Sequence, residues 1–343
     1  MPLLTVFTPA YNRKHTINRT YESLLRQTCK DFQWLIIDDG SSDGTREWVA
    51  SLGEAYPQPL PEGRGALSAY DWMGRSLSPD LSPEGERSAD HFIIEVPFAD
   101  GEGTLRIEYV YKPNGGLYTG YNVAYDLIDT ELCVCIDSDD YMPDDAVEII
   151  KRTWEGLSAD ERSKVGGILG LDYDVTTGGP LGGLFPVADK AAWVQDLHHA
   201  ADSKPVFRTM EIKRYAPQIG FEGEKDFNPH YMQMQVYDKL PMMVLNKNLC
   251  WVEYQFGADS MSEAIFKQYK RSPRSFAQFR LKELGLRKHQ DLKNQMRIYT
   301  HYVSSCIFSG DKDWLSKSPH KLMALLCAPL GVMLNIYIRY KAK

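Results

Sequence analysis

The chain has 343 residues, of which 43% are hydrophobic and 12% aromatic, and its formal net charge is −7. This composition excludes a disordered chain and suits one large α/β domain with additions, or two smaller domains. From Lys267 onward, sixteen Lys and Arg accompany only four Asp and Glu, a net charge of +12, whereas the preceding part is strongly acidic. We expect no nucleic-acid partner, because the acidic body would repel phosphates.

The first fifty residues alternate between strand-like and helix-like segments. An apolar run over residues 3–8 predicts a strand that ends in the turn 9–12, and a helix follows. A second apolar run, residues 32–37, ends in Asp38-Asp39-Gly40, and a second helix begins near Thr45. Strands that alternate with helices predict a parallel sheet with right-handed crossovers.

Residues 54–103 interrupt this alternation with six prolines among glycine, serine and glutamate. We interpret them as an irregular insertion in which the segments around residues 92–94 and 105–107 form a hairpin. The alternation resumes with a strand over residues 107–111 and a helix over about residues 118–128.

An apolar run over residues 132–136 predicts a buried strand, and Asp137-Ser138-Asp139-Asp140 follow it directly. We call residues 137–140 the acidic loop. Carboxylates at the carboxyl end of such a strand face the crevice where α/β sheets bind ligands, and their mutual repulsion calls for a cation such as Mg²⁺. The alternative is a solvated turn that caps the next helix. Asp144 or Asp145 can serve that cap, which leaves Asp137 and Asp139 available for a metal ion.

The cysteines and the start of the chain bear on location. Cys133 and Cys135 alternate in one strand-like run, so they point to the same face and make a poor disulfide. We expect them to be small core residues in a reducing compartment. Because no signal peptide precedes the first strand, we expect a cytoplasmic protein.

The C-terminal segment is basic and helix-like. Residues 322–338 contain no charge, include Pro329 and Gly331, and have lysine and arginine on both sides. Such a segment is short for a membrane span, but its basic flanks favour an element that lies in the interface of an anionic membrane. The alternative is a core helix docked on the domain.

Four motifs occur in an order that resembles the family 2 glycosyltransferases, namely residues 8–12, 34–45, 114–116 and 137–140. A thinner similarity over residues 221–225 and 251–254 is to a subgroup of bacterial enzymes that build cell-surface polysaccharides. The resemblance implies a GT-A fold over residues 1–265, a Rossmann-like α/β fold with a mixed, mostly parallel sheet flanked by helices. It leaves residues 266–343 as a helical, basic extension.

The resemblance also implies an activity, the inverting transfer of a sugar from a nucleotide sugar to a glycan or lipid-linked acceptor. Among nucleotide sugars, a UDP-sugar would be the first candidate for the donor. The cofactor would be Mg²⁺ or Mn²⁺. The protein would lie at the inner face of the cell membrane, in peripheral contact with anionic lipid. Two rivals remain. The first is a non-catalytic binding protein of the same fold, and the second is a nucleotidyltransferase, although residues 10–14 lack the glycine-rich loop that this class requires.

The resemblance assigns roles to individual residues. It implies that the nucleotide is bound by Thr8, Pro9, Ala10, Tyr11, Asn12, Asp38, Asp39, Asn122, Asp137 and Ser138. Asp139 would be the direct metal ligand, with Asp137 beside it. Family members often carry arginine where this chain has Tyr121, and the subgroup usually carries lysine where it has Leu117. Both departures remove positive charge, so the identities of sugar and acceptor stay open.

An inverting transfer also needs a general base that deprotonates the acceptor hydroxyl. Asp226 and Glu224 are equal candidates, ahead of Glu222 and His230. The alternative is that residues 224–226 form a solvated run of charges.

Overall fold

The computed structural model describes residues 1–54, 90–198, 202–253, 265–287 and 291–342, so most of the predicted insertion, residues 55–89, lies outside the described residues. The chain forms two compact units. The first comprises residues 1–115, 119–217 and 239–254, and the second comprises residues 116–118, 218–238 and 255–343.

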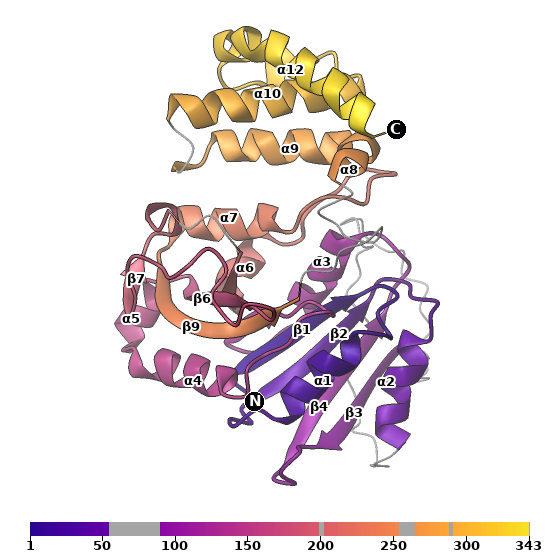
Figure 1. Ribbon diagram of the computed structural model, residues 1–343, viewed down its shortest axis with the longest axis vertical. Coiled ribbons are helices and arrows are strands. Elements are labelled where there is room, and N and C mark those ends of the chain that lie inside the picture. The colour runs from indigo at the N-terminus through magenta and orange to yellow at the C-terminus, as the bar shows by residue number, and fades with distance from the viewer. Residues whose placement is uncertain (55–89, 199–201, 254–264, 288–290, 343) are drawn as a thin grey trace. The chain divides into compact units, whose positions relative to one another are not determined.

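The first unit contains a nine-stranded mixed sheet in the order β3-β4-β2-β1-β5-β8-β6-β9-β7 (Figure 1). The described strands are β1 (Leu4–Ala10), β2 (Phe32–Asp38), β3 (His91–Pro97), β4 (Thr104–Tyr111), β5 (Leu132–Cys135), β6 (Gly167–Asp174), β7 (Lys190–Ala192), β8 (Ser203–Arg208) and β9 (Met242–Val252). Strands β4, β2, β1 and β5 run parallel, whereas β3 and β8 are antiparallel to their neighbours. The mixed, partly parallel sheet is therefore confirmed.

Helices cover the sheet of the first unit. They are α1 (Ile17–Leu25), α2 (Thr45–Glu54), α3 (Leu117–Leu127, of which the first two residues are grouped with the second unit), α4 (Ala146–Gly156), α5 (Ala159–Ser163) and α6 (Thr209–Ile212). Every residue of β1 and β2 is buried, which is why these strands read as continuous apolar runs. The main core packs Trp34 of β2 with Ile17 of α1, Val49 of α2 and Trp154 of α4.

The predicted hairpin is confirmed, because β3 pairs with β4 in a register that places Ile94 opposite Ile107. The prediction that Asp144 or Asp145 caps α4 was wrong. Asp145 occupies the N-cap position without a side-chain cap hydrogen bond, and Asp144 pairs with Arg26 at 3.2 Å. Instead, the N–H of Val147 donates to the side-chain oxygen of Gln27 at 3.0 Å, so a residue distant in sequence supplies the missing acceptor.

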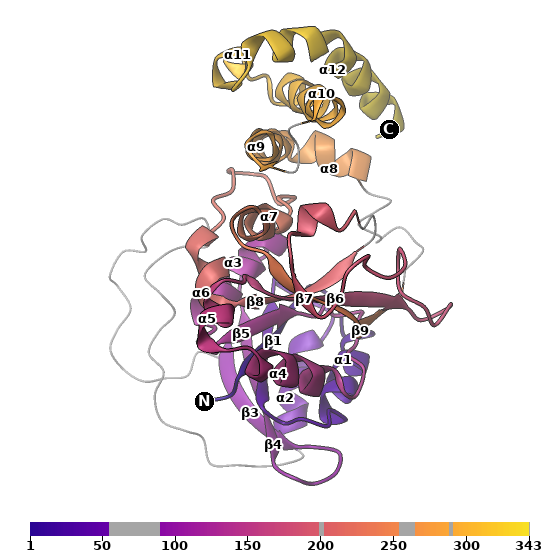
Figure 2. The same cartoon turned by 90° about the vertical axis from the view of Figure 1, so that its left-hand side faces the viewer.

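The second unit is helical, as predicted for the C-terminal region. Its helices are α7 (His230–Lys239, of which the last residue is grouped with the first unit), α8 (Ile265–Arg271), α9 (Pro273–Leu284), α10 (Leu292–Ser309), α11 (Trp314–Lys317) and α12 (Lys321–Lys341). Helix α10 packs between α9 and α12 (Figures 1 and 2). Their shared core includes Leu284, Ile298, Tyr302 and Cys327.

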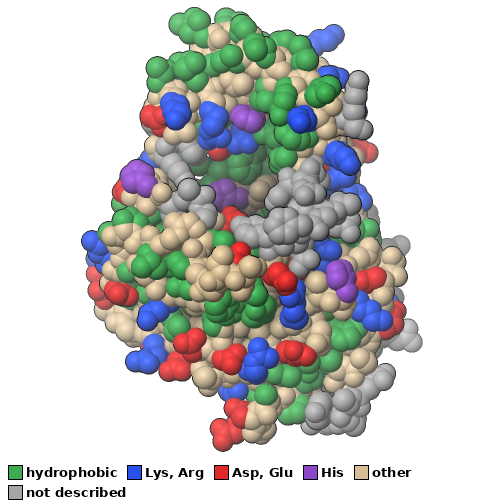
Figure 3. All heavy atoms as spheres, viewed as in Figure 1, with side chains coloured by type: hydrophobic (Ala, Val, Ile, Leu, Met, Phe, Trp, Pro, Cys, Tyr) green, Lys and Arg blue, Asp and Glu red, His purple; other side chains and the backbone are tan. Residues whose placement is uncertain are grey.

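Helix α12 has an unusual distribution of side chains. Its buried face carries mostly small or polar residues, among them Ala324, Cys327, Gly331 and Asn335. Its exposed side chains are large and apolar: Leu322, Leu325, Leu326, Leu330, Val332, Met333, Ile336, Tyr337 and Tyr340. Figure 3 shows hydrophobic side chains gathered over this helix, at the top of the view.

Candidate functional site

The first two motifs meet where β1 and β2 end. Ala10 of β1 lies in register with Asp38 of β2, so the segments that follow these strands begin side by side. The N–H of Asn12 donates to the hydroxyl of Ser41 at 2.8 Å, and the N–H of Ser42 donates to the Asn12 side-chain oxygen at 2.8 Å. Asn12 adopts a left-handed backbone conformation with φ of 55°, which asparagine tolerates better than most residues.

The residues of β1 that lead into these segments are buried and form the floor of the site. The Trp34 indole donates to the hydroxyl of Thr8 at 2.9 Å, and Thr8, Pro9 and Ala10 are buried. Tyr11 is 49% exposed, so its ring is available to a ligand from the solvent side. An exposed aromatic ring above a buried strand end is the kind of surface on which a nucleobase packs.

The aspartate pair of the second motif is held from the strand β4. Asp38 is fully buried and accepts hydrogen bonds from the Tyr109 hydroxyl at 2.6 Å and the Ser41 N–H at 2.7 Å. Asp39 forms a buried ion pair with Lys112 and accepts the N–H of Gly115 at 2.9 Å. Asp38 thus connects β4 with the turn at Ser41, whereas Asp39 stabilises the turn at residues 114–116. Sequence reasoning missed Tyr109 and Lys112, because no local pattern links them to residues about seventy positions earlier.

The acidic loop follows β5, next to β1 in the sheet. Its shape is fixed by a turn in which the Asp140 N–H donates to the Asp137 carbonyl at 3.0 Å. From α1, the Thr20 hydroxyl donates to the Asp140 carbonyl at 2.7 Å, and Arg19, which pairs with Glu253, donates to the Asp139 carbonyl at 3.3 Å.

The carboxylates of the acidic loop differ in exposure. Asp137 is exposed and Asp139 is partly exposed, whereas Ser138 and Asp140 are buried. The two carboxylates expected to bind metal are therefore accessible. Among the described residues, no group of three or more His, Cys, Asp and Glu side chains is arranged to hold a metal ion.

The local electrostatics concentrate negative charge. Desolvation, together with the neighbouring carboxylates and against the opposing charge of Lys204, raises the pKa of Asp140 to about 8. A cation placed among these oxygens would relieve the repulsion. The accessible carboxylates therefore fit a hard divalent cation such as Mg²⁺ or Mn²⁺.

Tyr121, which stands where relatives often have arginine, is a packing residue. Its ring contacts Phe7 edge-on with centroids 5.1 Å apart, and its hydroxyl donates to the Cys135 sulfur at 3.1 Å. Burial raises the pKa of Tyr121 well above its ordinary value, so it stays protonated. Asn122 beside it is also buried. Tyr121 therefore extends the core behind the acidic loop and supplies no charge to a diphosphate.

The two candidate bases lie in the second unit, at the start of α9. Glu224 is buried and accepts the N–H groups of Arg274 at 3.0 Å and Ser275 at 2.7 Å, together with the Arg274 guanidinium. Asp226 accepts the Arg271 guanidinium and, at 2.8 Å, the Ser272 hydroxyl. The Glu224 contacts satisfy two of the first N–H groups of α9, which is a structural role, whereas Asp226 binds only side chains. Their role as a general base stays a prediction.

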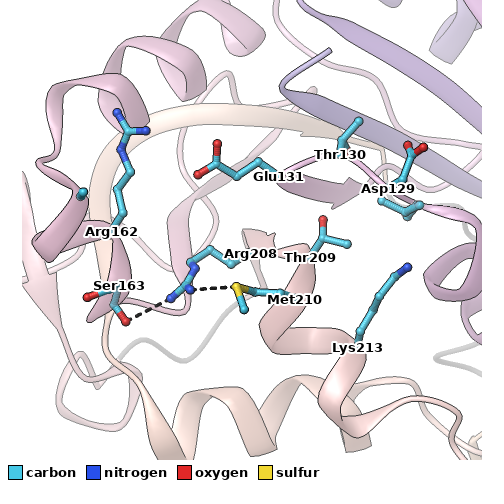
Figure 4. Close-up of a pocket in the computed structure, with 11 residues that line it drawn as sticks. Asp129, Thr130, Glu131, Arg162, Ser163, Arg208, Thr209, Met210 and Lys213 are labelled. Atoms are coloured by element: carbon cyan, nitrogen blue, oxygen red, sulfur yellow. Dashed lines mark hydrogen bonds between the residues drawn. The ribbon is translucent and has the colours of Figure 1, made fainter. Parts of the chain in front are cut away.

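A cavity of about 530 Å³ lies elsewhere in the first unit, and none of the predicted site residues line it (Figure 4). Its cations are already engaged. Arg208 donates to the Ser163 carbonyl and to the Met210 sulfur, each at 3.1 Å, and Lys213 donates to the Asp126 carbonyl at 3.3 Å. The cavity therefore offers no charged group for a ligand beyond those that support its own walls.

Comparisons with known proteins agree with the motifs and the fold. Residues 5–69 match the model of the family "Glycosyl transferase family 2". Chondroitin synthase of Pasteurella multocida is 26% identical over 149 residues, 43% of this chain and 10% of that protein. The glucosyltransferase WfgD of Escherichia coli, which by its name acts on a diphosphoundecaprenol-linked sugar, is 43% identical over 53 residues, 16% of this chain and 21% of that protein.

A solved structure extends the likeness to the whole chain. The S. aureus TarS 1-349 structure in complex with UDP-GlcNAc has a TM-score of 0.55 and 17% sequence identity, and the match covers 100% of this chain and 88% of that one. This likeness shows the fold, while the chain spans only about a tenth of the length of the chondroitin synthase. The match of residues 5–69 makes this part of the chain similar to the family 2 glycosyltransferases, and the likeness to the TarS structure shows a shared fold over the whole chain.

Proposed function

We propose that the chain is an inverting, metal-dependent glycosyltransferase that moves a sugar from a nucleotide sugar, a UDP-sugar first of all, to a hydroxyl of a glycan or lipid-linked acceptor. The observation that carries this proposal is the position of the acidic loop. It follows β5, which neighbours β1, which neighbours β2, so three motifs end at one edge of the sheet. Ligands of open α/β sheets bind at this edge. The names of the relatives support a role in cell-surface polysaccharide synthesis.

The residues divide the work by position. Asp139 and Asp137 would hold Mg²⁺ or Mn²⁺, which would stabilise the leaving diphosphate. Tyr11 would contact the nucleobase above the floor of Thr8, Pro9 and Ala10. Asn12, Asn122, Ser138 and one carboxylate of the pair Asp38 and Asp39 would complete the nucleotide site.

Asp139→Asn tests the metal site with the smallest change of shape. We expect Mn²⁺-stimulated turnover of the donor to fall by about a hundredfold or more, because the amide is a much poorer ligand for a hard cation. The unfolding midpoint should stay near that of the wild type. Asp126→Asn, an exposed change on α3, is the matched control and should leave turnover intact. Full activity of Asp139→Asn would refute the assignment.

A thermal-shift panel of UDP-, GDP-, dTDP- and CMP-sugars with Mn²⁺ identifies the donor, because a ligand that binds only the folded state raises the unfolding midpoint. We expect the UDP-sugars to give the largest shifts. A response to nucleotide sugars without any transfer to acceptors would favour the non-catalytic binding protein.

We propose Asp226, ahead of Glu224, as the general base. Arg271, the partner of Asp226, is mostly exposed and can move away, whereas Glu224 also accepts two backbone N–H groups. Asp226→Asn and Glu224→Gln separate the two roles. Loss of a base lowers kcat and removes the acidic limb of the pH–rate profile. Loss of a cap lowers the unfolding midpoint. A normal pH–rate profile in both variants would place the base elsewhere.

We also propose that α12 rests on the anionic inner face of the cell membrane. Its large apolar side chains are exposed, and Lys321, Arg339 and Lys341 at its ends can contact lipid phosphates. Among the described residues, α12 alone is long and apolar enough to cross a bilayer, with a mean hydropathy of 1.7. The basic charge of the region favours an anionic surface over a second copy of the chain, which would carry the same charge.

Cosedimentation of the full chain with vesicles tests this contact. We expect binding to vesicles that contain phosphatidylglycerol and much weaker binding to pure phosphatidylcholine. The double change Leu326→Ser and Met333→Ser should abolish binding, because it removes two exposed apolar anchors. Light scattering that reveals a stable dimer, which the double change dissociates, would instead assign the face to a second copy.

A further inference from the structure

Three aromatic side chains lie on neighbouring segments next to the acidic loop, and the nucleotide site described above does not use them. Trp251, near the end of β9, lies in register with Tyr173 of β6, and their ring centroids are 5.7 Å apart with an angle of 80° between the rings. On its other side, Trp251 pairs in an antiparallel bridge with Tyr141, the residue that follows Asp140. We call Tyr141, Trp251 and Tyr173 the aromatic row.

The aromatic row faces away from the main core. Cys250 belongs to this core and Val252 packs against it, and these two residues flank Trp251 in β9. Because successive side chains of a strand point to opposite faces, Trp251 projects from the other face of the sheet. Residues directly opposite each other on neighbouring strands project from the same face, so Tyr141 and Tyr173 lie beside it. All three are partly exposed.

Two sets of contacts fix the end of β9 to the acidic loop. Tyr141 and Trp251 exchange both backbone hydrogen bonds, with N···O distances of 3.2 Å and 2.7 Å. Glu253, directly after β9, forms an ion pair with Arg19. The Arg19 guanidinium also donates to the carbonyl of Asp139 at 3.3 Å. The aromatic row therefore begins at the acidic loop and extends across β9 to β6.

The chemistry of the aromatic row suits sugar rings. The C–H hydrogens on one face of a pyranose pack against the negative face of an aromatic ring, and its hydroxyls can bond the indole N–H and the phenol groups. Three positions on neighbouring strands span about 10 Å, which is longer than one pyranose ring. Arg19 and Glu253 beside the row are 39% and 41% exposed and can bond further hydroxyls. A hydrocarbon chain has no groups for these donors and acceptors, so the row favours a glycan over a lipid.

We propose that the aromatic row is the subsite for the acceptor, in which at least two pyranose rings of a glycan pack along Tyr141, Trp251 and Tyr173. The proposal rests on the glycosyltransferase activity proposed above. It names the sugar rings of the acceptor, and not a lipid attached to them, as the part that the first unit binds. Tyr11 is the ring assigned to the nucleobase, so the two aromatic surfaces serve two different ligands.

Saturation-transfer difference NMR of the full chain with cellobiose, lactose and chitobiose, in the presence of UDP and diamagnetic Mg²⁺, tests this without any turnover. We expect at least one of the three disaccharides to bind the wild type. Trp251→Ala should weaken that binding at least about tenfold, because the central ring is lost, whereas Trp251→Phe keeps a ring and should stay within about threefold. Calorimetric titration with UDP and Mg²⁺ is the matched measurement. Trp251→Ala should keep the UDP affinity of the wild type, whereas Tyr11→Ala should lose UDP affinity and keep disaccharide binding.

The reciprocal losses separate a subsite from damage, because a merely structural defect would weaken both ligands in one variant. Undiminished disaccharide binding by Trp251→Ala overturns the proposal, and so does a parallel loss of UDP affinity, which would assign the aromatic row to the donor. If Trp251→Ala does not fold, Tyr173→Ala decides by the same criteria. A wild-type chain that binds UDP but none of the disaccharides refutes this inference alone. A chain that binds a disaccharide but no nucleotide sugar refutes the proposed function and, with it, the acceptor role of the row.

Discussion

Tyr109 shows how a single hydroxyl supports the second motif. It donates to Asp38, a fully buried carboxylate that also accepts the Ser41 N–H. Tyr109→Phe is expected to lower the free energy of unfolding by about 1–3 kcal/mol, because a buried carboxylate loses a hydrogen bond. Urea denaturation measures this loss. Tyr111→Phe, on the same strand, is the control and should change stability by less than about 0.5 kcal/mol.

His301 predicts a pH dependence of stability. It is half enclosed by α8 and α9, where the Tyr269 hydroxyl lies 2.9 Å from its ring nitrogen. Desolvation, with the charges of Arg280 and Arg297, lowers its pKa to about 4. Between the unfolded pKa near 6.5 and the folded pKa, the unfolded state binds one more proton, so stability falls as the pH falls through this window.

The size of this effect is limited to roughly 3 kcal/mol by the difference between the two pKa values. Urea unfolding at pH 7 and at pH 4.5 should show a smaller difference for His301→Gln, which cannot gain a proton, than for the wild type. Equal differences in both proteins would show that His301 does not titrate as described.

At the scale of elements, the contact between α10 and α12 depends on the absence of a side chain at Gly331. A Cβ there would lie 2.6 Å from a methyl carbon of Val303. Gly331→Ala is therefore expected to push the helices apart and lower the free energy of unfolding by about 1–3 kcal/mol. Adding Val303→Ala should recover part of this loss. Leu330→Ala, an exposed change one residue away, is the control for helix α12 itself.

The same elements show why an apolar segment is hard to interpret from sequence. The composition of residues 322–338 is compatible with a core helix and with an element in the membrane interface, because composition does not show which face of the helix packs against the rest of the protein. The structure shows small residues against α10 and large apolar residues outside, with Asn335 donating to the Ser304 carbonyl at 3.1 Å. Small residues and a polar contact at a helix seam are typical of helices that associate in lipid.

At the scale of the whole molecule, residues 218–238 group with the C-terminal helices, although the sequence predicts a domain boundary near residue 265. Ending the chain at residue 265 would remove the partners of Glu224 and Asp226 on α8 and α9. We expect such a chain to be cleaved within residues 218–238 by limited proteolysis, whereas the full chain resists cleavage there. Resistance of the shortened chain would show that these residues fold without α9.

The sequence alone determined the alternation of strands and helices, the hairpin of β3 and β4, and the position of the acidic loop. These features depend on local periodicity and on the simple rule that strand ends bind ligands. Only the tertiary structure decided which groups hold the carboxylates of the second motif: Tyr109 for Asp38 and Lys112 for Asp39. The reason is physical, because these partners come from strands that neighbour in the sheet but not in the chain, and their register is set by the packing of the whole core.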